Sequence, residues 1–378
     1  MPSIEANKCD WLPTGEEALA SMLAAIDAAK NSIRLEMYIV TDCPLALRFL
    51  AALISARQRG VQVRILMDAG GSFALAASFW DSLRAAGGEV RVFNPLTLKR
   101  FNIRNHRKLV VCDDRVAFIG GFNISTEYDG DGVTRGWCDL GMRIEGLLAA
   151  PLAATFDGMF QNAELQHKRF PRLRRLNSKR VVASTEAQIL LSGPGRGRSP
   201  IKHALQEDLA HAKNVQIVMA YFLPTWRMRR DLTRVARRGG AVQFILAGKS
   251  DVAVSQLAGQ SLYRKFLKAG VGIHEYQPQI LHAKLIIVDD VVYVGSANLD
   301  QRSLTINYEL MVRFEDELMA AQAREIFASA LKHSKPIQLA EWRKSRTIWM
   351  KLKQRFAYWL LMRFDTYVAR RQWKNLPD

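Results

Sequence analysis

The sequence predicts an α/β protein with two tandem, similar α/β/α sandwich domains and a basic, amphipathic C-terminal helical tail. Helical patterns alternate with short apolar runs, which is typical of sandwich domains, and the second half of the chain repeats the first. The length of 378 residues exceeds that of an ordinary single domain. Because 49% of the residues are apolar and 24% are charged, the chain can bury a large core, which excludes a wholly disordered protein.

The elements follow from the pattern in chain order. In the first half, strands are expected near residues 33–40, 61–67, 89–93, 108–112, 115–119 and 138–144, and helices near 15–29, 45–59, 75–87 and 147–163. The second half repeats this order, with helices near 201–212, 226–238, 253–269 and 317–331. The runs Leu109-Val-Val and Leu285-Ile-Ile are apolar without alternation, as expected of strands covered on both faces.

The internal repeat has an offset that shrinks from about 180 to about 170 residues. Residues 60–68 return in outline as 240–248, and residues 32–40 return more loosely as 215–223. The best match pairs 106–114 with 282–290. We therefore infer a duplication, with a first repeat at 1–164, a connector at 165–200, a second repeat at 201–335 and a tail at 336–378.

The formal net charge of +18 is concentrated in the connector and the tail. Residues 165–185 hold seven bases and no acid, and residues 341–378 hold ten bases and three acids, so each segment contributes +7. The bases of the connector are Lys168, Arg169, Arg172, Arg174, Arg175, Lys179 and Arg180. Such a balance indicates an anionic partner, meaning nucleic acid, acidic lipid or a phosphorylated substrate. The Gly- and Pro-rich residues 192–200 are expected to form a loop without a phosphate-binding GxxxxGK[ST] motif.

Both repeats contain the pattern His-x-Lys-x4-Asp, followed by an Asn sixteen or seventeen residues after the His. The residues are His106, Lys108, Asp113 and Asn123 in the first repeat, and His282, Lys284, Asp289 and Asn298 in the second. Side chains two apart on a strand point the same way, so each repeat can present an imidazole and an ammonium to one site. We include Asp113 and Asp289 with the catalytic residues as members of the motif, although they lie an odd number of residues from the histidines, which favours a turn or scaffold role.

This residue set suits phosphoryl or phosphatidyl transfer. A neutral imidazole can attack phosphorus while the ammonium and the Asn amides stabilise charge on its oxygens. A second imidazole can protonate the leaving alkoxide and then deprotonate the incoming alcohol. Asp139 and Glu309 occupy matching strand positions and could orient the histidines, although both could also be ordinary exposed carboxylates. The chemistry requires no metal or cofactor, and the sequence offers no carboxylate cluster for a metal.

The paired motifs resemble those that define the phospholipase D superfamily. Within it, residues 104–111 and 295–309 are most similar to bacterial cardiolipin synthases, and residues 35–39 and 68–72 also resemble segments of that family. The resemblance covers roughly residues 10–335. Since no membrane helix is evident near the N-terminus, we expect the shorter, cardiolipin synthase B-like branch.

The resemblance implies a two-step exchange through a phosphatidyl-histidine, in which two phosphatidylglycerols give cardiolipin and glycerol. It implies His106 as nucleophile and His282 as acid and base, with the reverse assignment open. Phosphate would be bound by Lys108, Lys284, Asn123, Asn298 and Ser296. The first repeat departs from the second by having Gly121 where the second has Ser296, and by extra residues around 128–134 that could shape acceptor choice.

The tail carries apolar residues at helical spacing, namely Trp349, Leu352, Phe356, Leu360, Phe364 and Tyr367. Lys351, Lys353, Arg355 and Arg363 are interspersed among them, and Trp373 follows. The pattern predicts either a helix in the interface of an anionic phospholipid membrane or a helix whose aromatic face packs on the protein's own body.

The expected partner is therefore an anionic, phosphatidylglycerol-containing membrane, with no nucleic acid and with activity in a single chain. The four scattered cysteines fit a reducing compartment, and no secretory signal or spanning segment is visible. We expect a peripheral protein on the cytoplasmic face of the bacterial inner membrane. Open alternatives are a phospholipase D-type phosphodiesterase that hydrolyses phospholipid or nucleic acid, and, less favoured, an inert membrane-binding scaffold.

Overall fold

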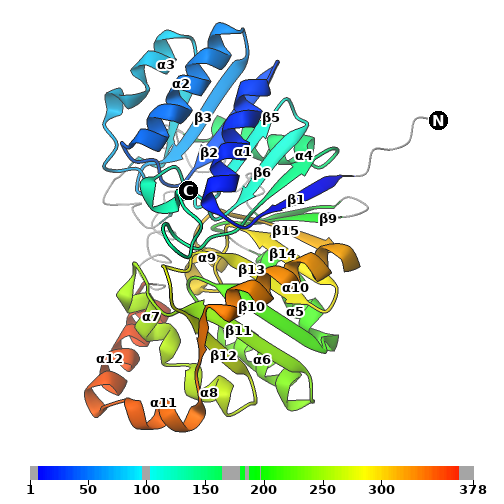
Figure 1. Cartoon of the computed structure of the whole chain (residues 1–378), viewed down its shortest axis with the longest axis vertical. Coiled ribbons are helices and arrows are strands. Elements are labelled where there is room, and N and C mark those ends of the chain that lie inside the picture. The colour runs from blue at the N-terminus through cyan, green and yellow to red at the C-terminus, as the bar shows by residue number, and fades with distance from the viewer. Residues whose placement is uncertain (1–6, 96–102, 164–178, 184–186, 196, 366–378) are drawn as a thin grey trace, which may run out of the picture.

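The computed structural model describes residues 7–95, 103–163, 179–183, 187–195 and 197–365. Each half of the chain forms its own sheet, and the two resulting domains are stacked along the long axis of the molecule (Figure 1). The predicted α/β class and the tandem arrangement are thereby confirmed.

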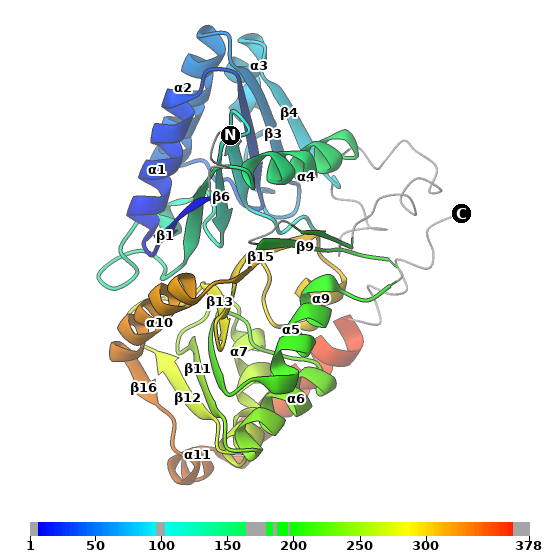
Figure 2. The same ribbon diagram turned by 90° about the vertical axis from the view of Figure 1, so that its right-hand side faces the viewer.

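The first sheet has seven strands in the order β1-β7-β6-β5-β2-β3-β4. Their bounds are β1 Lys8–Leu12, β2 Ser32–Met37, β3 Gln62–Asp68, β4 Glu89–Phe93, β5 Leu109–Cys112, β6 Val116–Gly120 and β7 Gly141–Glu145. β2, β3 and β4 pair in parallel and the remaining neighbours are antiparallel. Helices α1 (Gly15–Ala28), α2 (Pro44–Gln58) and α3 (Asp81–Ala85) cover one face, and α4 (Ala149–Gln161) covers the other (Figure 2).

The second sheet has nine strands in the order β16-β12-β11-β10-β13-β14-β15-β9-β8. Their bounds are β8 Arg180–Ala183, β9 Ala187–Ser192, β10 Asn214–Met219, β11 Ala241–Ala247, β12 Gly272–Tyr276, β13 Lys284–Val288, β14 Val291–Gly295, β15 Glu309–Glu315 and β16 Ser334–Pro336. Helices α5 (Pro200–His211), α6 (Trp226–Arg237), α7 (Ala253–Gln260) and α8 (Tyr263–Leu267) pack on one face, and α10 (Glu317–Lys332) packs on the other. The short helix α9 (Gln301–Thr305) precedes β15.

The buried strands alternate between two cores. In β5, Leu109 and Val111 belong to a cluster that spans both domains, whereas Val110 belongs to the cluster under α1 and α2. Leu285 and Ile287 of β13 join the same shared cluster from the second domain. All five side chains are at most 2% exposed, as predicted for strands covered on both faces, and each contributes about 1.5–3 kcal/mol to folding. The shared cluster joins the two domains through buried apolar surface.

The connector prediction is wrong in part. Residues 187–192 form β9, which pairs antiparallel with β15, and residues 180–183 form β8 at the edge of the sheet. Ile189, Leu190 and Leu191 are buried, and this apolar run, rather than the basic residues before it, determines the local structure. Of the seven connector bases, Lys168, Arg169, Arg172, Arg174 and Arg175 lie outside the described residues. The helix predicted at 253–269 is divided into α7 and α8.

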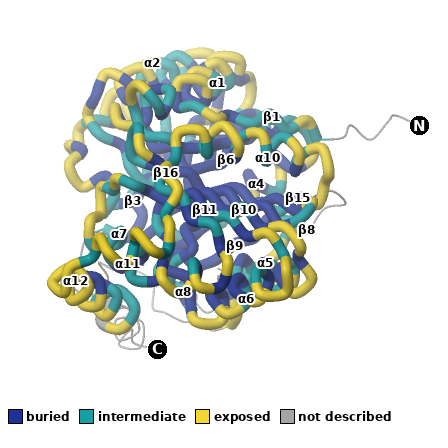
Figure 3. The backbone as a smooth tube through the Cα atoms, turned by 60° about the horizontal axis from the view of Figure 1, so that its bottom comes forward, coloured by how far each residue is buried: buried dark blue, intermediate teal, exposed yellow. Residues whose placement is uncertain are grey.

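The tail forms two helices, α11 (Leu339–Ser345) and α12 (Ile348–Trp359), and a π-type turn at 360–365. α12 contacts α7 through its buried residues Gln354 and Ala357. The predicted apolar face points outward, with Trp349 71% and Phe356 62% exposed (Figure 3). Packing of that face on the body is therefore the wrong alternative for these residues. The side chain of Phe364, and Tyr367 and Trp373, lie outside the described residues. No helix within the described ranges is both long and apolar enough to cross a membrane.

Candidate active site

Each catalytic-motif histidine lies just before a central strand, and backbone bonds fasten it to the other domain. The His106 N–H donates to the Tyr308 carbonyl at 3.0 Å, and the His282 N–H donates to the Cys138 carbonyl at 2.7 Å. Tyr308 directly precedes Glu309, and Cys138 directly precedes Asp139. The two bridges therefore bring a carboxylate of one repeat to the histidine of the other.

The carboxylate of each repeat contacts the histidine of the other repeat. His106 Nδ1 lies 3.1 Å from the carboxylate of Glu309, and His282 Nδ1 lies 2.6 Å from Asp139 Oδ2. Glu309 and Asp139 are at most 2% exposed, so the alternative of ordinary surface carboxylates is wrong. A carboxylate that accepts the Nδ1 proton leaves the Nε2 lone pair free, which is the tautomer that a nucleophile or a base requires.

The two lysines lie beneath the histidines. Lys108 Nζ donates to the His106 carbonyl at 2.6 Å and stands 5.0 Å from the centre of the Tyr38 ring. Lys284 Nζ lies 2.7 Å from His282 Nδ1 and also donates to the His282 carbonyl. Both lysines are at most 3% exposed. Each repeat thus places its imidazole and its ammonium together, as their spacing of two residues predicts.

Burial sets the protonation of these groups. Burial, reinforced by the ammonium of Lys284, lowers the pKa of His282 to about 4, and burial also lowers the pKa of His106. Burial lowers the pKa of Lys108 to about 7 and that of Lys284 to about 8. Both imidazoles are therefore neutral near pH 7 in this structure.

The carboxylates respond in the opposite direction to their cationic neighbours. Burial acts to raise the pKa of Asp139, but Lys284 and His282 outweigh it and hold that pKa below its ordinary value. His106 and Lys108 do the same for the pKa of Glu309. Both carboxylates are consequently ionised and can stabilise an imidazolium when one forms.

The predicted amide ligands are fixed in matching ways. Asn123 Oδ1 accepts the Ile39 N–H at 3.0 Å, and Asn298 Oδ1 accepts the Tyr221 N–H at 3.3 Å. Both residues line the cavity beside the histidines. Because the carbonyl oxygens are engaged, the amide nitrogens are the atoms left to face a ligand, and that of Asn123 donates to the Tyr128 hydroxyl at 2.8 Å.

The hydroxyl of Ser296 contacts a carboxylate. Ser296 is predicted to bind phosphate, but its Oγ donates to Glu309 at 2.5 Å and accepts the Leu310 N–H at 3.1 Å. Gly121, at the matching position of the first repeat, has no room for such a hydroxyl, since a Cβ there would lie 2.1 Å from Asp139 Oδ1. The serine thus supports the longer carboxylate, and the glycine accommodates the shorter one.

Asp113 and Asp289 stand apart from the histidines. Asp113 accepts the backbone N–H groups of residues 30, 31 and 32 at 2.7–2.9 Å, and Asp289 accepts those of residues 213 and 214 at 2.8–3.2 Å. Both occupy tight turns with φ of 54° and 48°, which Asp tolerates better than most residues. Their inclusion among the catalytic residues is corrected accordingly: the geometry is that of the scaffold role expected from their odd spacing.

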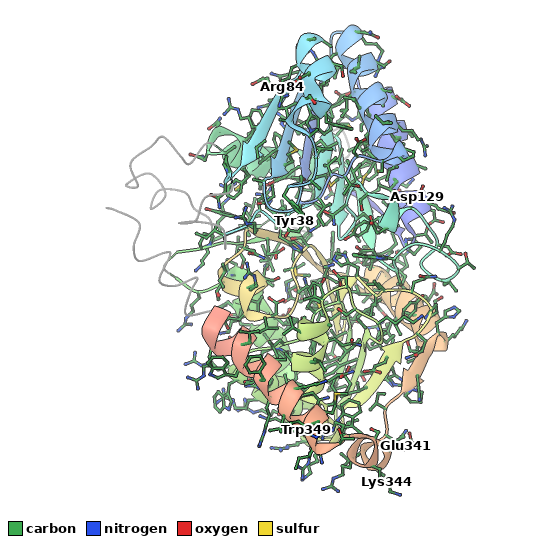
Figure 4. The ribbon with its side chains drawn as sticks, turned by 90° about the vertical axis from the view of Figure 1, so that its left-hand side faces the viewer. Tyr38, Arg84, Asp129, Glu341, Lys344 and Trp349 are labelled. Atoms are coloured by element: carbon green, nitrogen blue, oxygen red, sulfur yellow. The ribbon has the colours of Figure 1, made fainter. Side chains whose placement is uncertain are left out.

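The histidines open into a cavity of about 410 Å³ between the domains. Aromatic side chains surround them: the Tyr38 ring lies 4.8 Å from that of His106, and the rings of Tyr128 and Trp137 lie 5.3 and 5.5 Å from that of His282. Figure 4 labels Tyr38 at the level where the two domains meet. Tyr128 belongs to the extra residues that could shape acceptor choice, whereas no role was predicted for Tyr38 or Trp137. Tyr38 and Tyr221 nevertheless occupy the same position in the repeated segments 32–40 and 215–223.

Polar residues line the far wall of the cavity. Asp251 accepts the Tyr221 hydroxyl at 2.6 Å, and burial raises the pKa of Asp300 to about 6. Arg302 also contributes to the wall. Across the part of the chain that the structure describes, no three His, Cys, Asp or Glu side chains are grouped so as to hold a metal ion. The arrangement can hold a phosphodiester between two imidazoles.

Comparisons with known proteins agree with this geometry. A family model described as "Cardiolipin synthase, PLD-like domain" matches residues 22–128 and 205–331. Cardiolipin synthase 1 of Bacillus cereus is 31% identical over 356 residues, which cover 91% of this chain and 70% of that protein. Cardiolipin synthase B of Salmonella typhi is 30% identical over 372 residues, covering 97% of this chain and 90% of that protein. Phosphatidylserine synthase of Haemophilus influenzae shares the fold, with a TM-score of 0.75 and 15% identity over 96% of this chain and 94% of that one.

Proposed function

Because this chain belongs to the cardiolipin synthase family of phospholipase D-like proteins, we propose that it is a phosphatidyltransferase that converts two phosphatidylglycerols into cardiolipin and glycerol. One observation carries the proposal. The two repeats place one imidazole each in a single cavity, and each imidazole is oriented by a carboxylate of the opposite repeat. This pair supplies both a nucleophile and an acid, which a displacement at phosphorus requires.

In the first step, His106 Nε2 attacks the phosphorus of one phosphatidylglycerol. A P–N bond forms, the bond from phosphorus to the glycerol headgroup oxygen breaks, and His282 gives that oxygen its proton. In the second step, the headgroup hydroxyl of another phosphatidylglycerol loses its proton to His282 and attacks phosphorus, and the P–N bond breaks. Protons and charge balance over the two steps, and the reversed assignment of the histidines balances equally.

Electrostatics support the protonation states that these steps need. Glu309 accepts the Nδ1 proton of His106 and favours attack through Nε2, while the ionised Asp139 stabilises an imidazolium at His282. A bound phosphodiester brings a negative charge beside His282, which raises the pKa of that imidazole and favours its protonated form. Lys108 and Lys284, which now donate to histidine carbonyls, are close enough to neutralise the phosphate oxygens.

A peripheral location at the cytoplasmic face of the membrane fits the substrate and the thiols. Among the described residues, Cys43, Cys112 and Cys138 are not joined in disulfides, which is compatible with a reducing compartment. Hydrolysis needs only water in place of the second headgroup, and nucleic acid presents the same diester. The experiment below therefore separates these three outcomes.

The test incubates purified protein with phosphatidylglycerol vesicles and resolves the lipid products. Wild type should form cardiolipin, His106→Ala should form none, and His203→Ala, which alters a half-exposed histidine on α5, should match wild type. Formation of phosphatidic acid alone would make the protein a hydrolase. Cleavage of DNA or RNA without any lipid product would reject the lipid reading.

A further inference from the structure

Helix α12 reaches the mouth of the catalytic cavity. Leu361, in the turn that ends it, lines the cavity together with His106 and His282. The helix packs along α7, and the residues directly before α7, Asp251 and Val252, line the same cavity. Figure 4 shows α12 rising from Trp349, at the far end of the second domain, toward the level of Tyr38. The surface of α12 is thus continuous with the site.

The inner face of α12 is satisfied by the protein body. Gln354 and Ala357 are each 2% exposed, and the guanidinium of Arg229 lies 5.5 Å from the centre of the Tyr358 ring. These contacts fix the rotation of the helix about its own axis. They leave no freedom for the opposite face to turn inward.

The outer face of α12 is apolar. Its exposed side chains include Ile348 at 71%, Trp349 at 71%, Leu352 at 49% and Phe356 at 62%. A soluble surface rarely gathers four large apolar side chains on one helix without a partner. A Trp residue among them is typical of helices that lie at the boundary between water and lipid.

Positive charge surrounds this face. Between residues 339 and 363 the chain has seven bases and one acid, a net +6. Lys351, Lys353 and Arg355 alternate with the apolar side chains of α12 and are exposed. Each base near an anionic bilayer contributes about 1 kcal/mol to binding, whereas the same charges on two copies of the chain would repel each other.

Other apolar side chains mark the same edge of the two sheets. Phe73 follows β3 and is 76% exposed, and Trp226 follows β10 and is 56% exposed. Parallel strands end at the same edge, and Tyr38 and Tyr221, which line the cavity, follow β2 and β10. The site therefore opens on the edge that carries these side chains.

We propose that α12 lies in the headgroup layer of an anionic phospholipid bilayer and holds the mouth of the cavity against the lipid surface. The inference deepens the proposed function and rests on it for the identity of the substrate. A diacyl lipid then reaches the histidines without leaving the bilayer completely, because the end of the docking helix is also part of the cavity wall.

The test compares matched pairs of exposed side chains. Trp349→Ser with Phe356→Ser removes 71% and 62% exposed residues from α12. The control pair, Leu318→Ser with Leu147→Ser, removes 68% and 61% exposed residues at the opposite edge, where β15 and β7 end. Sedimentation with phosphatidylglycerol vesicles should show binding about tenfold weaker for the first pair and unchanged for the control. Phosphatidylcholine vesicles should bind wild type weakly.

Turnover separates this inference from the proposed function. The α12 pair should lose turnover of phosphatidylglycerol in vesicles but retain it in detergent micelles. Wild type that binds vesicles but turns over neither form would reject the proposed function and leave the docking surface standing. If the α12 double variant binds vesicles and converts their phosphatidylglycerol like wild type, the docking surface is rejected. It is also rejected if the variant keeps vesicle binding but loses dimerisation or nucleic-acid binding. A fluorescence experiment decides the same question if the α12 double variant fails to fold. Brominated acyl chains should quench the fluorescence of Trp349, which is measured as the difference between wild type and Trp349→Phe. Absence of quenching rejects the inference.

Discussion

The imidazole of His106 and the carboxylate of Glu309 lie 3.1 Å apart although they belong to different repeats. The reciprocal pair, His282 and Asp139, lies 2.6 Å apart. Neither repeat alone contains a complete histidine and carboxylate pair. The duplication therefore does more than supply a second imidazole, because each half-site is built from both domains.

Replacing Glu309 tests the pairing of each histidine with a carboxylate of the other repeat. Glu309 raises the pKa of His106, so Glu309→Gln should lower that pKa further. The substitution should also remove the preference of His106 for the tautomer that carries its proton on Nδ1. We expect kcat to fall about 10²–10⁴-fold, as for other orienting carboxylates. Nitrogen-resolved NMR of the histidines checks the assignment. A change at His282 with His106 unaffected would contradict the crossed pairing.

The serine and glycine at matching positions provide a second test. Gly121→Ser should displace the Asp139 carboxylate, because even a Cβ there would lie 2.1 Å from Oδ1, and should reduce kcat about as much as Asp139→Asn. Ser296→Gly removes one hydrogen bond to Glu309 and should cost only about tenfold in kcat. Steady-state kinetics on phosphatidylglycerol measure both. Equal effects of the two substitutions would show that the repeats do not differ as described.

The pH profile follows from the lowered pKa values. Lys108, with a pKa of about 7, and Lys284, with a pKa of about 8, lose their protons as the pH rises, so kcat/KM should fall on the alkaline side. His106, whose pKa is lowered, remains a neutral nucleophile just below pH 6.5, and acid favours the protonated form that His282 needs, so activity should persist into mild acid.

Lys108→Arg provides the matched variant for that profile. Its guanidinium keeps its charge, so the alkaline limb should move upward to the one set by Lys284. Rates on a short-chain phosphodiester over pH 5–10 measure both enzymes. An unchanged alkaline limb would mean that Lys108 does not bind phosphate as an ammonium.

The motif aspartates are expected to affect stability rather than chemistry. Asp113→Ala removes an acceptor of three backbone N–H groups and should lower the free energy of unfolding by about 2 kcal/mol. The kcat of the remaining folded enzyme should stay within about twofold of wild type. Urea unfolding and active-site titration separate the two effects. A collapse of kcat at full stability would return Asp113 to the catalytic residues.

Local patterns predicted most of the fold. Leu109 and Leu285 lie in short apolar runs that form strands buried on both faces, because hydrophobic periodicity reports local burial directly. β1 and β9 were not predicted, although they occupy matching places beside β7 and β15. β1 is short and half polar. β9 was predicted to be part of a connector because it follows a basic segment, although it contains an apolar run.

The sequence identified the main residues of the site but not the contacts that they make between the two repeats. Spacing shows that His106 and Lys108 share a direction, but it does not show which domain supplies a partner, so the crossing of Glu309 was not predicted. The same limit explains Ser296, whose hydroxyl faces a carboxylate instead of a ligand. Tyr128 reaches His282 through the first-repeat insertion, for which the second repeat has no counterpart to compare.

Trapping the covalent intermediate tests the central claim most directly. His282→Ala should still form the adduct from a phosphatidyl ester with a good leaving group such as p-nitrophenol, but should release it slowly because the base is missing. Acid quenching, proteolysis and mass spectrometry should then find a phosphatidyl group on the peptide that contains His106. An adduct on another residue, or no adduct while cardiolipin still forms, would contradict the account.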